Sequence, residues 1–398
     1  MRRLQTYAAQ MPAASQPSTP ADLIALVEFR HLLHSHPELS GCEQETAARV
    51  VTFLEPLRPD RVLTGVGGHG VVATFDSGLP GPTLLFRSEL DALPIVEHDV
   101  EGHASTVHGV SHKCGHDGHT TMLCGLAQRL AARRPERGAV HLLFQPAEET
   151  GTGAAAVLAD PQFDDIRPDF AVAIHNMPGF PKGSLVIKPG AITAAVRSIV
   201  LRFAGRTAHA SEPEKGENPS LAVADLLRGC AEISVNDPDS PDFCLITPVH
   251  VRVGSVAYGV SAGDGEVHLT IRTFANEGLA ALQQRIVDLA TLLAARDSMR
   301  LEVEVVEDFY ANMNDPEAAG VALTAAELCG FDVITPERGL RGGEDFGVFS
   351  ERFPCCMVLL GAGEDTHPIH NPHYDFADDL LDVGVRLFDT IVRSATGG

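Results

Sequence analysis

Apolar runs of strand length alternate with helical segments over the first half of the chain. Continuous apolar runs are typical of strands that are buried on both faces of a parallel sheet. The runs lie near 70–76, 83–87, 140–144 and 170–174, and helical patterns lie near 19–36, 43–54 and 119–134. This alternation predicts the α/β fold class, with a mostly parallel sheet flanked by helices.

The residues 19–22 predict the start of the first helix. Thr19 is suited to cap the helix, Pro20 to its first turn, and Asp22 to the position three residues after the cap. Residues of these types satisfy backbone N–H groups that have no partner at a helix start. Pro37 then ends the helix, because proline cannot continue the hydrogen-bond ladder.

The pattern changes after about residue 193. Ile199, Leu201 and Phe203 share one face of a predicted strand, and such a period of two marks strands with one solvent-facing side. The same alternation recurs at 267–271 and 301–305, and helical patterns cover 219–235 and 277–296. Residues 194–307 are therefore predicted to form a separate α+β unit.

Past residue 310 the first pattern returns. A helix is predicted from Asp315-Pro316 to Gly330, and a buried strand is predicted over 356–360. The simplest organisation is a discontinuous domain, with a smaller domain inserted in it. Two domains also suit the length of 398 residues, which exceeds what one core usually supports. The predicted division is 1–193 and 308–398 for the main domain and 194–307 for the insert.

The net charge and the composition exclude some classes of binding partner. The net charge of -23 repels the phosphates of nucleic acids and anionic membranes, so neither is an expected partner. No apolar stretch approaches the roughly 20 residues of a membrane span. The eight cysteines are scattered along the chain. Scattered cysteines favour reduced thiols, and hence a cytoplasmic location, over a disulfide framework.

Candidate chemistry is concentrated in the segment Lys113–His119, KCGHDGH. It holds a thiol, two imidazoles and a carboxylate, and its two glycines let the backbone bend so that these groups converge. Thiolate and imidazole are the ligands that a borderline-soft metal such as zinc prefers. For the segment taken alone, the alternative interpretation, with the smaller weight, is a polar turn with an incidental thiol.

Further potential ligands follow the predicted strands. Glu148 and Glu149 come soon after the run 140–144, His175 directly follows 170–174, and Asp91 follows 83–87. In open α/β sheets, ligands bind beyond the carboxyl ends of the strands. Several such residues together with a Cys/His segment are hard to ascribe to chance.

If these strand ends converge, the chain can hold one or two metal ions that lower the pKa of a water to about 7. The candidate ligands are Cys114, His116, Glu149, His175 and His370. Glu148 is adjacent to a ligand but points elsewhere, as a general base must. Without the other clusters, two neighbouring glutamates at a helix start would be interpreted as a solvated pair.

Longer motifs run nearly from end to end. They are RHLLHSHPEL at 30–39, DALPI at 91–95, KCGHDGH at 113–119, FQPAEE at 144–149, HA at 209–210, GEN at 216–218, RTF at 272–274, GEDF at 343–346 and HNP at 370–372. This set resembles the dinuclear-metal aminoacylase and carboxypeptidase family. Within it, the chain is most similar to the branch of hippurate hydrolase and the plant indoleacetyl-amino-acid hydrolases.

The resemblance implies a role for each matching residue of the metal site. Cys114 would be a metal-bridging thiolate, and Glu148 would be general base and then general acid. Asp91 would orient a ligand imidazole. One metal would take His116 and His175, and the other would take Glu149 and His370.

The resemblance implies a zinc-exopeptidase-like catalytic domain and, for the inserted domain, a lid that also forms a homodimer. His209 would stabilise the oxyanion, often in the active site of the partner subunit. Asn218 and Arg272 would bind the carboxylate of the substrate, and arginine suits this role through its bidentate geometry.

The chain departs from the branch at two places. It reads Arg-Ser-Glu-Leu-Asp at 87–91, where the branch usually has Arg-Ala-Asp-Met-Asp, so the second acid is retained. The lid segment Asn-Val-Ile-Pro is replaced by Gly-Val-Ser-Ala at 259–262. An asparagine amide expected near the substrate is therefore missing, which leaves the acyl group and the amino acid open.

The sequence as a whole predicts a cytoplasmic metal-dependent amidohydrolase. It would use two divalent ions (zinc, manganese, cobalt or nickel) to cleave an N-acyl amino acid, or a related small amide, to a carboxylic acid and a free amine. One alternative is a dipeptidase or aminopeptidase with the same site. The other is a catalytically silent metal-binding dimer, which the intact Glu148 disfavours.

Overall fold

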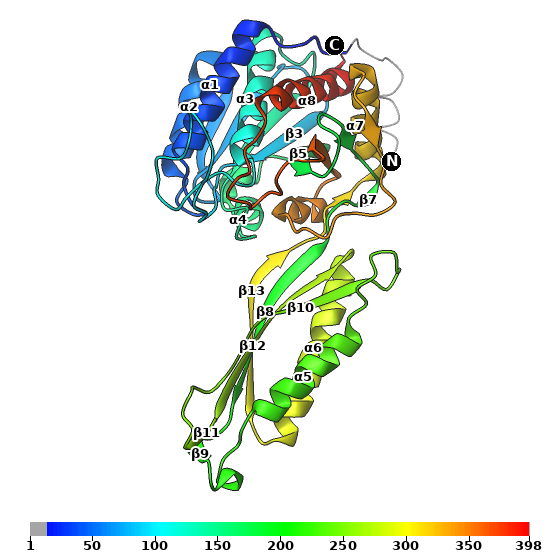
Figure 1. Ribbon diagram of the computed structural model, residues 1–398. Coiled ribbons are helices and arrows are strands. Elements are labelled where there is room, and N and C mark those ends of the chain that lie inside the picture. The colour runs from blue at the N-terminus through cyan, green and yellow to red at the C-terminus, as the bar shows by residue number, and fades with distance from the viewer. Residues whose placement is uncertain (1–13, 398) are drawn as a thin grey trace. The chain divides into compact units, whose positions relative to one another are not determined.

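The computed structural model describes residues 14–397. These residues form two compact units, each described here by itself (Figure 1). The first unit comprises 14–192, 312–337 and 345–397, and the second comprises 193–311 and 338–344. The stretch 338–344, which the sequence analysis assigns to the main domain, thus groups with the inserted unit. The boundary expected after residue 307 lies after residue 311.

A sheet of eight strands forms the centre of the first unit, in the order β1-β2-β4-β3-β5-β16-β6-β15. The four neighbours β4, β3, β5 and β16 are parallel to one another, while β1 and β2 join antiparallel. The predicted fold class is confirmed. The strands are β1 (Arg61–Val66), β2 (Gly70–Asp76), β3 (Thr83–Glu89), β4 (Ala139–Gln145), β5 (Phe170–Pro178), β6 (Leu185–Val186), β15 (Val333–Ile334) and β16 (Cys355–Gly363).

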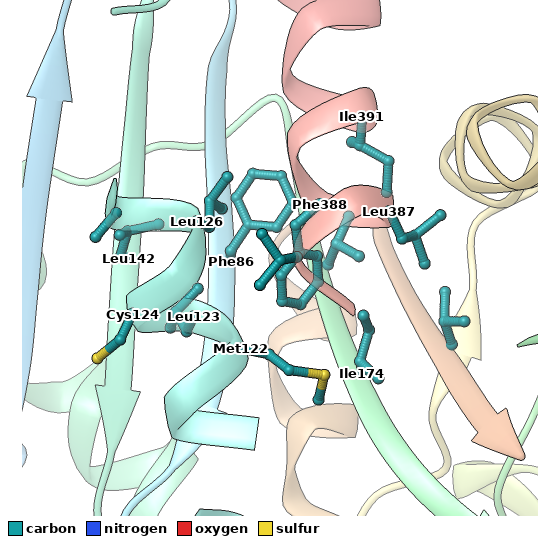
Figure 2. Close-up of a cluster of buried hydrophobic side chains, with 14 of the residues drawn as sticks. Phe86, Met122, Leu123, Cys124, Leu126, Leu142, Ile174, Leu387, Phe388 and Ile391 are labelled. Atoms are coloured by element: carbon teal, nitrogen blue, oxygen red, sulfur yellow. The ribbon is translucent and has the colours of Figure 1, made fainter. Parts of the chain in front are cut away.

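Helices pack around this sheet, and α3 contacts both α1 and α8. Their bounds are α1 (Pro20–Ser35), α2 (Gln44–Leu54), α3 (His116–Ala132), α4 (Gly153–Ala159), α7 (Pro316–Cys329) and α8 (Leu381–Thr396). Figure 2 shows the side chains that join α3 and α8 to the sheet, among them Phe86, Leu126 and Phe388. Complete burial of one such side chain stabilises the fold by about 1.5–3 kcal/mol.

Two helix starts follow the sequence prediction. Thr19 caps α1 and accepts a hydrogen bond from the backbone N–H of Asp22. Asp315 caps α7 in the same way, and α7 ends at Gly330 with φ of 72°. Only a residue without a Cβ adopts this left-handed conformation at little cost. No helix among the described residues is long and apolar enough to cross a membrane.

The second unit is an antiparallel sheet in the order β10-β12-β8-β13 with two helices, as the period-two pattern predicts. Its elements are β8 (Ala195–Ala204), β10 (Cys244–Val253), β12 (Asp264–Thr273), β13 (Arg300–Phe309), α5 (Ser220–Ile233) and α6 (Asn276–Arg296). A short pair, β9 (Ala208–His209) and β11 (Val260–Ser261), lies outside this sheet. In the first unit, a further short pair joins β7 (Gly190–Ala191) and β14 (Met313–Asn314).

The sequence analysis missed β10 because Pro248 interrupts its apolar pattern. Proline lacks the N–H that a central strand needs, but an edge strand tolerates it. β10 is an edge strand, and its register with β12 shifts between Pro248 and His250. On the opposite edge, Val303 and Val305 are exposed rather than buried.

Candidate metal centre

The cysteine–histidine segment bends at Gly115, directly before α3. Gly115 has φ of 93°, and a Cβ there would collide with the side-chain amide of Asn176. The helix then begins at His116, three residues earlier than the sequence predicts. Cys114 thus precedes the bend, and His116 lies in the first helical turn.

Cys114, His116 and His175 form one buried group with a potential metal-ligating atom on each side chain. These three atoms lie within 4.8 Å of one another, and the Cys114 Sγ to His175 Nε2 distance is 3.4 Å. The Nδ1 of His175 donates to the Asn176 carbonyl, and that of His116 donates to the Asp91 carbonyl. With Nδ1 occupied in this way, each imidazole keeps the lone pair of Nε2 for an ion. The Nε2 of His116 is buried and makes no hydrogen bond.

Cys114 also belongs to a second group, with Glu149 and His370. The His370 Nε2 lies 3.5 Å from Glu149 Oε2, and His116 Nε2 lies 3.7 Å from Glu149 Oε1. The two groups therefore overlap at one thiol. Sulfur, nitrogen and carboxylate oxygen at this spacing suit borderline divalent ions. All five ligands named from the sequence lie together, and their assignment to individual ions stays a prediction.

Glu148 lies in a turn after β4, not at a helix start as expected, since α4 begins only at Gly153. Ala147 has φ of 52°, and its N–H donates to the Glu43 carboxylate at 2.8 Å. The Glu149 N–H donates to Asp91 Oδ2 at 3.0 Å. These two anchors fix the turn so that Glu148 Oε2 lies 3.7 Å from His116 Nε2.

Negative charge dominates the electrostatics of this site. Burial raises the pKa of the Cys114 thiol well above its usual value, and the carboxylates of Glu149 and Glu148 raise it further. Burial lowers the pKa of His116, but hydrogen bonding to Asp91 and nearby carboxylates outweigh it and raise the pKa to about 10. Burial lowers the pKa of His175 to about 3. A cation at the site would favour the thiolate and the neutral imidazoles that bind metals.

Three supporting residues were not assigned from the sequence. Glu89 Oε2 lies 2.7 Å from His119 Nδ1, and His119 Nε2 lies 2.5 Å from the side-chain oxygen of Asn176. Asn176 in turn follows the ligand candidate His175 on β5. Glu89 stays charged, because Arg87 and His119 outweigh burial and lower its pKa. His119 lies inside the KCGHDGH motif and Asn176 beside His175, which are the signals that could have found these two residues. Glu89 stands where the branch usually has an aspartate, which is the signal for the third.

The GEDF motif supplies a further support through Asp345. Its buried carboxylate accepts hydrogen bonds from Arg87 Nη2 at 2.6 Å, Gln145 Nε2 at 2.8 Å and the Ala154 N–H at 2.8 Å. Asp345 thus joins the ends of β3 and β4 to the start of α4. The turn that carries Glu148 lies between the last two of these contacts.

Three candidate residues belong to the second unit and have local partners there. Exposed His209 on β9 has Nδ1 2.7 Å from Ser211 Oγ. Asn218 donates to Ser261 Oγ at 2.9 Å, inside the 259–262 segment that departs from the branch. Arg272 on β12 donates to the Arg341 carbonyl at 2.6 Å. Their predicted roles toward the substrate stay predictions.

Comparison with known proteins identifies the family. The model of Peptidase family M20/M25/M40 matches residues 85–394. The chain belongs to this family. An N-acetylcysteine deacetylase of Bacillus subtilis is 30% identical over 364 residues, 91% of this chain and 94% of the relative. A hippurate hydrolase of Campylobacter jejuni is 30% identical over 360 residues, 89% and 92% of the two chains.

Solved structures agree with this family assignment. A Bacillus subtilis protein described as a dinuclear metal binding peptidase of the M20 family has a TM-score of 0.81 at 28% identity, covering 94% of this chain and 98% of its own. A putative aminohydrolase of Staphylococcus aureus has a TM-score of 0.84 at 28% identity and covers 98% of both chains. This M20 protein is a metal-dependent amidohydrolase that uses two divalent ions.

Metal uptake should release protons from this M20 protein. The thiol of Cys114 is protonated at neutral pH without metal, because its pKa is raised, and only the thiolate binds an ion. Affinity should therefore weaken as the pH falls. Calorimetric metal titrations in buffers of different ionisation enthalpy count the protons. Cys114→Ser should release fewer, whereas Cys124→Ser, a buried thiol on α3, should match the unchanged protein. Equal release from both variants would contradict a metal-bound thiolate.

Proposed function

We propose that this M20 protein hydrolyses N-acyl amino acids, or closely related small amides, to a carboxylic acid and an amino acid. The observation that carries the proposal is that Cys114 belongs to both potential metal groups while Glu148 lies beside them. The names of the relatives support it, since a deacetylase of N-acetylcysteine and a hydrolase of hippurate both act on acylated amino acids.

In this proposal, Cys114 would bridge two ions. His116 and His175 would hold one ion, and Glu149 and His370 would hold the other, which agrees with the residues of the two groups. Asp91 is the orienting residue. Its carbonyl accepts from His116 Nδ1 at 2.9 Å, and its carboxylate receives the Glu149 N–H.

The bound ions would lower the pKa of a water and polarise the amide carbonyl. Glu148 takes the proton of the attacking water and delivers it to the leaving nitrogen, which needs a carboxylate near the site but outside the ligand set. His209 stabilises the oxyanion, and Asn218 and Arg272 hold the substrate carboxylate. The side-chain amide of Asn218 donates to Ser261 Oγ. Since Ser261 lies in the segment that departs from the branch, the substrate specificity of this chain would differ from that of the branch at this contact.

A dipeptidase or aminopeptidase reaction is the second candidate, since the same dinuclear chemistry cleaves either amide. The two differ in whether the substrate carries an acyl group or a free amine at the scissile bond. An assay of acetyl-, benzoyl- and indoleacetyl-amino acids against dipeptides, with zinc, manganese, cobalt and nickel each supplied, separates them. Turnover of dipeptides alone would replace the first proposal with the second.

Chelation should abolish hydrolysis, because both water activation and carbonyl polarisation depend on the ions. Added divalent metal should restore it. Turnover and metal content are measured on the same samples by a colorimetric assay and elemental analysis. Undiminished turnover in a metal-free sample would overturn the proposal.

Glu148→Gln and Glu149→Ala should lose activity for different reasons. Glu148→Gln keeps the side-chain shape and all five ligands, so it should retain two ions while kcat falls by about 10²–10⁴-fold. Glu149→Ala removes a ligand and should lower the metal content as well. Elemental analysis beside steady-state kinetics distinguishes the two. Loss of metal from Glu148→Gln alone would mean that the two roles are exchanged.

We further propose a homodimer formed through the second unit. β10 is an edge strand of its sheet, and edge strands offer unpaired backbone groups to a second copy. Exposed apolar side chains lie on this edge strand: Val249 is 66% exposed and Val251 is 40% exposed. Two such edges can pair antiparallel about a twofold axis.

The dimer makes the contribution of His209 testable. His209→Ala should preserve the metal content and the dimer but lower kcat by about 10²–10³-fold, comparable to the loss of one oxyanion donor. If His209 acts in the partner's site, mixing His209→Ala with Glu148→Gln protomers regenerates a competent site in each mixed dimer. Activity is measured after subunit exchange is shown by mass spectrometry. Complete exchange without recovered activity would restrict His209 to its own subunit.

A cytoplasmic location is the remaining part of the proposal. All eight cysteines are free thiols, and seven of them are buried. Reduced thiols of this kind are typical of a compartment that keeps cysteines reduced.

A further inference from the structure

Three exposed histidines gather beside the loop that carries His370. The ring of His373 has its centre 5.5 Å from that of His98 and 5.4 Å from that of His367. All three side chains are exposed, and none belongs to the five ligands of the metal centre. The proposed function leaves this cluster without a role.

Asp99 orients the central histidine of this cluster. Its Oδ2 accepts from His373 Nδ1 at 2.7 Å, which fixes the tautomer and leaves the lone pair on Nε2. A carboxylate that holds an imidazole in this way is the usual second partner of a metal-ligating histidine. Asp99 also has φ of 60°, a left-handed conformation that aspartate tolerates better than most residues.

Backbone contacts bring the two segments of the cluster together. The N–H of His98 donates to the Pro372 carbonyl at 3.0 Å, which joins the two segments. Within the second segment, the N–H of His373 donates to the side-chain oxygen of Asn371 at 2.9 Å. The histidines therefore come from segments more than 260 residues apart in sequence that are tied at this point (Asp99 and His373 are separated by 274).

The ring spacing suits a shared ion. Two imidazoles bound to one tetrahedral ion at about 2.0–2.1 Å have ring centres about 5 Å apart. The two spacings around His373 are close to this value. Exposed side chains change rotamer within nanoseconds, so the three Nε2 atoms can turn toward one point.

A second group of similar composition already has a protein cation against it. His34, His103 and Asp375 also present three potential ligands. However, the guanidinium of Arg30 already lies against this group, 2.9 Å from His103 Nε2 and 3.0 Å from Asp375. The guanidinium of Arg30 occupies these potential ligand atoms and leaves no place for a metal. Within residues 14–397, no arginine or lysine forms a hydrogen bond or ion pair with His98, His367 or His373.

We propose that His98, His367 and His373, with Asp99 orienting His373, form a surface site for one further divalent transition-metal ion. Imidazole ligands select zinc, cobalt, nickel or copper over magnesium and calcium, which prefer oxygen. Since His370 and His373 belong to one loop, an ion here would fasten that loop to the segment of His98. The site is separate from the two ions of the catalytic centre.

The test uses the intact protein with its two resident ions. It is titrated calorimetrically with Ni²⁺ and separately with Zn²⁺, while elemental analysis follows the resident and the added metal. We expect one further ion per subunit, with the resident pair retained and Mg²⁺ not bound. Absence of a third ion at millimolar Ni²⁺ and Zn²⁺ would overturn the proposal.

Variants then assign the third ion to this cluster. The double change His98→Gln/His373→Gln should abolish its binding, and Asp99→Asn should weaken it by about 10–100-fold, the usual effect of removing an orienting carboxylate. Both should keep two ions and unchanged turnover, which shows that the fold is intact. His108→Gln, an exposed histidine of the same region, is the matched control and should bind as before. Unchanged affinity in the double variant, or equal loss in the control, would contradict the assignment.

Discussion

The arrangement of the catalytic centre depends on four buried or nearly buried carboxylates that converge on one thiol. Glu89, Asp91, Glu148 and Glu149 all lie near Cys114 or its imidazole neighbours. Buried charge is costly unless it is paired, and Arg87 neutralises only part of it, through Glu89 and Asp345. Divalent ions would neutralise the remaining negative charge. Burial, and then the same carboxylates, raise the pKa of the Cys114 thiol, so in the proposed site metal binding would be coupled to the deprotonation of Cys114.

The α/β sheet explains how these groups come to one place. Parallel strands bring their carboxyl ends to one edge, so the residues after β3, β4 and β5 meet there, and the bend at Gly115 adds the first turn of α3. The buried ion pair between Arg87 and Asp345 then ties residues 258 positions apart in sequence. Because removal of one partner would leave an uncompensated buried charge, this pair makes the turn of Glu148 depend on the far end of the chain.

Local patterns in the sequence were sufficient to predict most helices and strands, but not the long-range contacts that hold the candidate site in place. Continuous apolar runs identify the central strands. The helix caps at Thr19 and Asp315 are recognisable because a proline follows each of them directly. The strand β10 was missed because Pro248 is acceptable only at an edge, and edge position is a property of the whole sheet. The contact of His119 with Glu89 and that of Asp345 with Gln145 were missed for a related reason. A side chain's partner across the fold leaves no periodicity to detect.

The stretch 338–344 belongs to the second unit and leads directly to Asp345, which belongs to the first. The second unit holds this stretch through the Arg272 contact to the Arg341 carbonyl and the Arg338 ion pair with Asp239. The next residue along the chain is Asp345, whose carboxylate is buried against Arg87 and whose N–H lies 3.4 Å from Glu148 Oε1. Asp345 therefore supports the turn of Glu148 from within the first unit, through Gln145 before the turn and the Ala154 N–H after it.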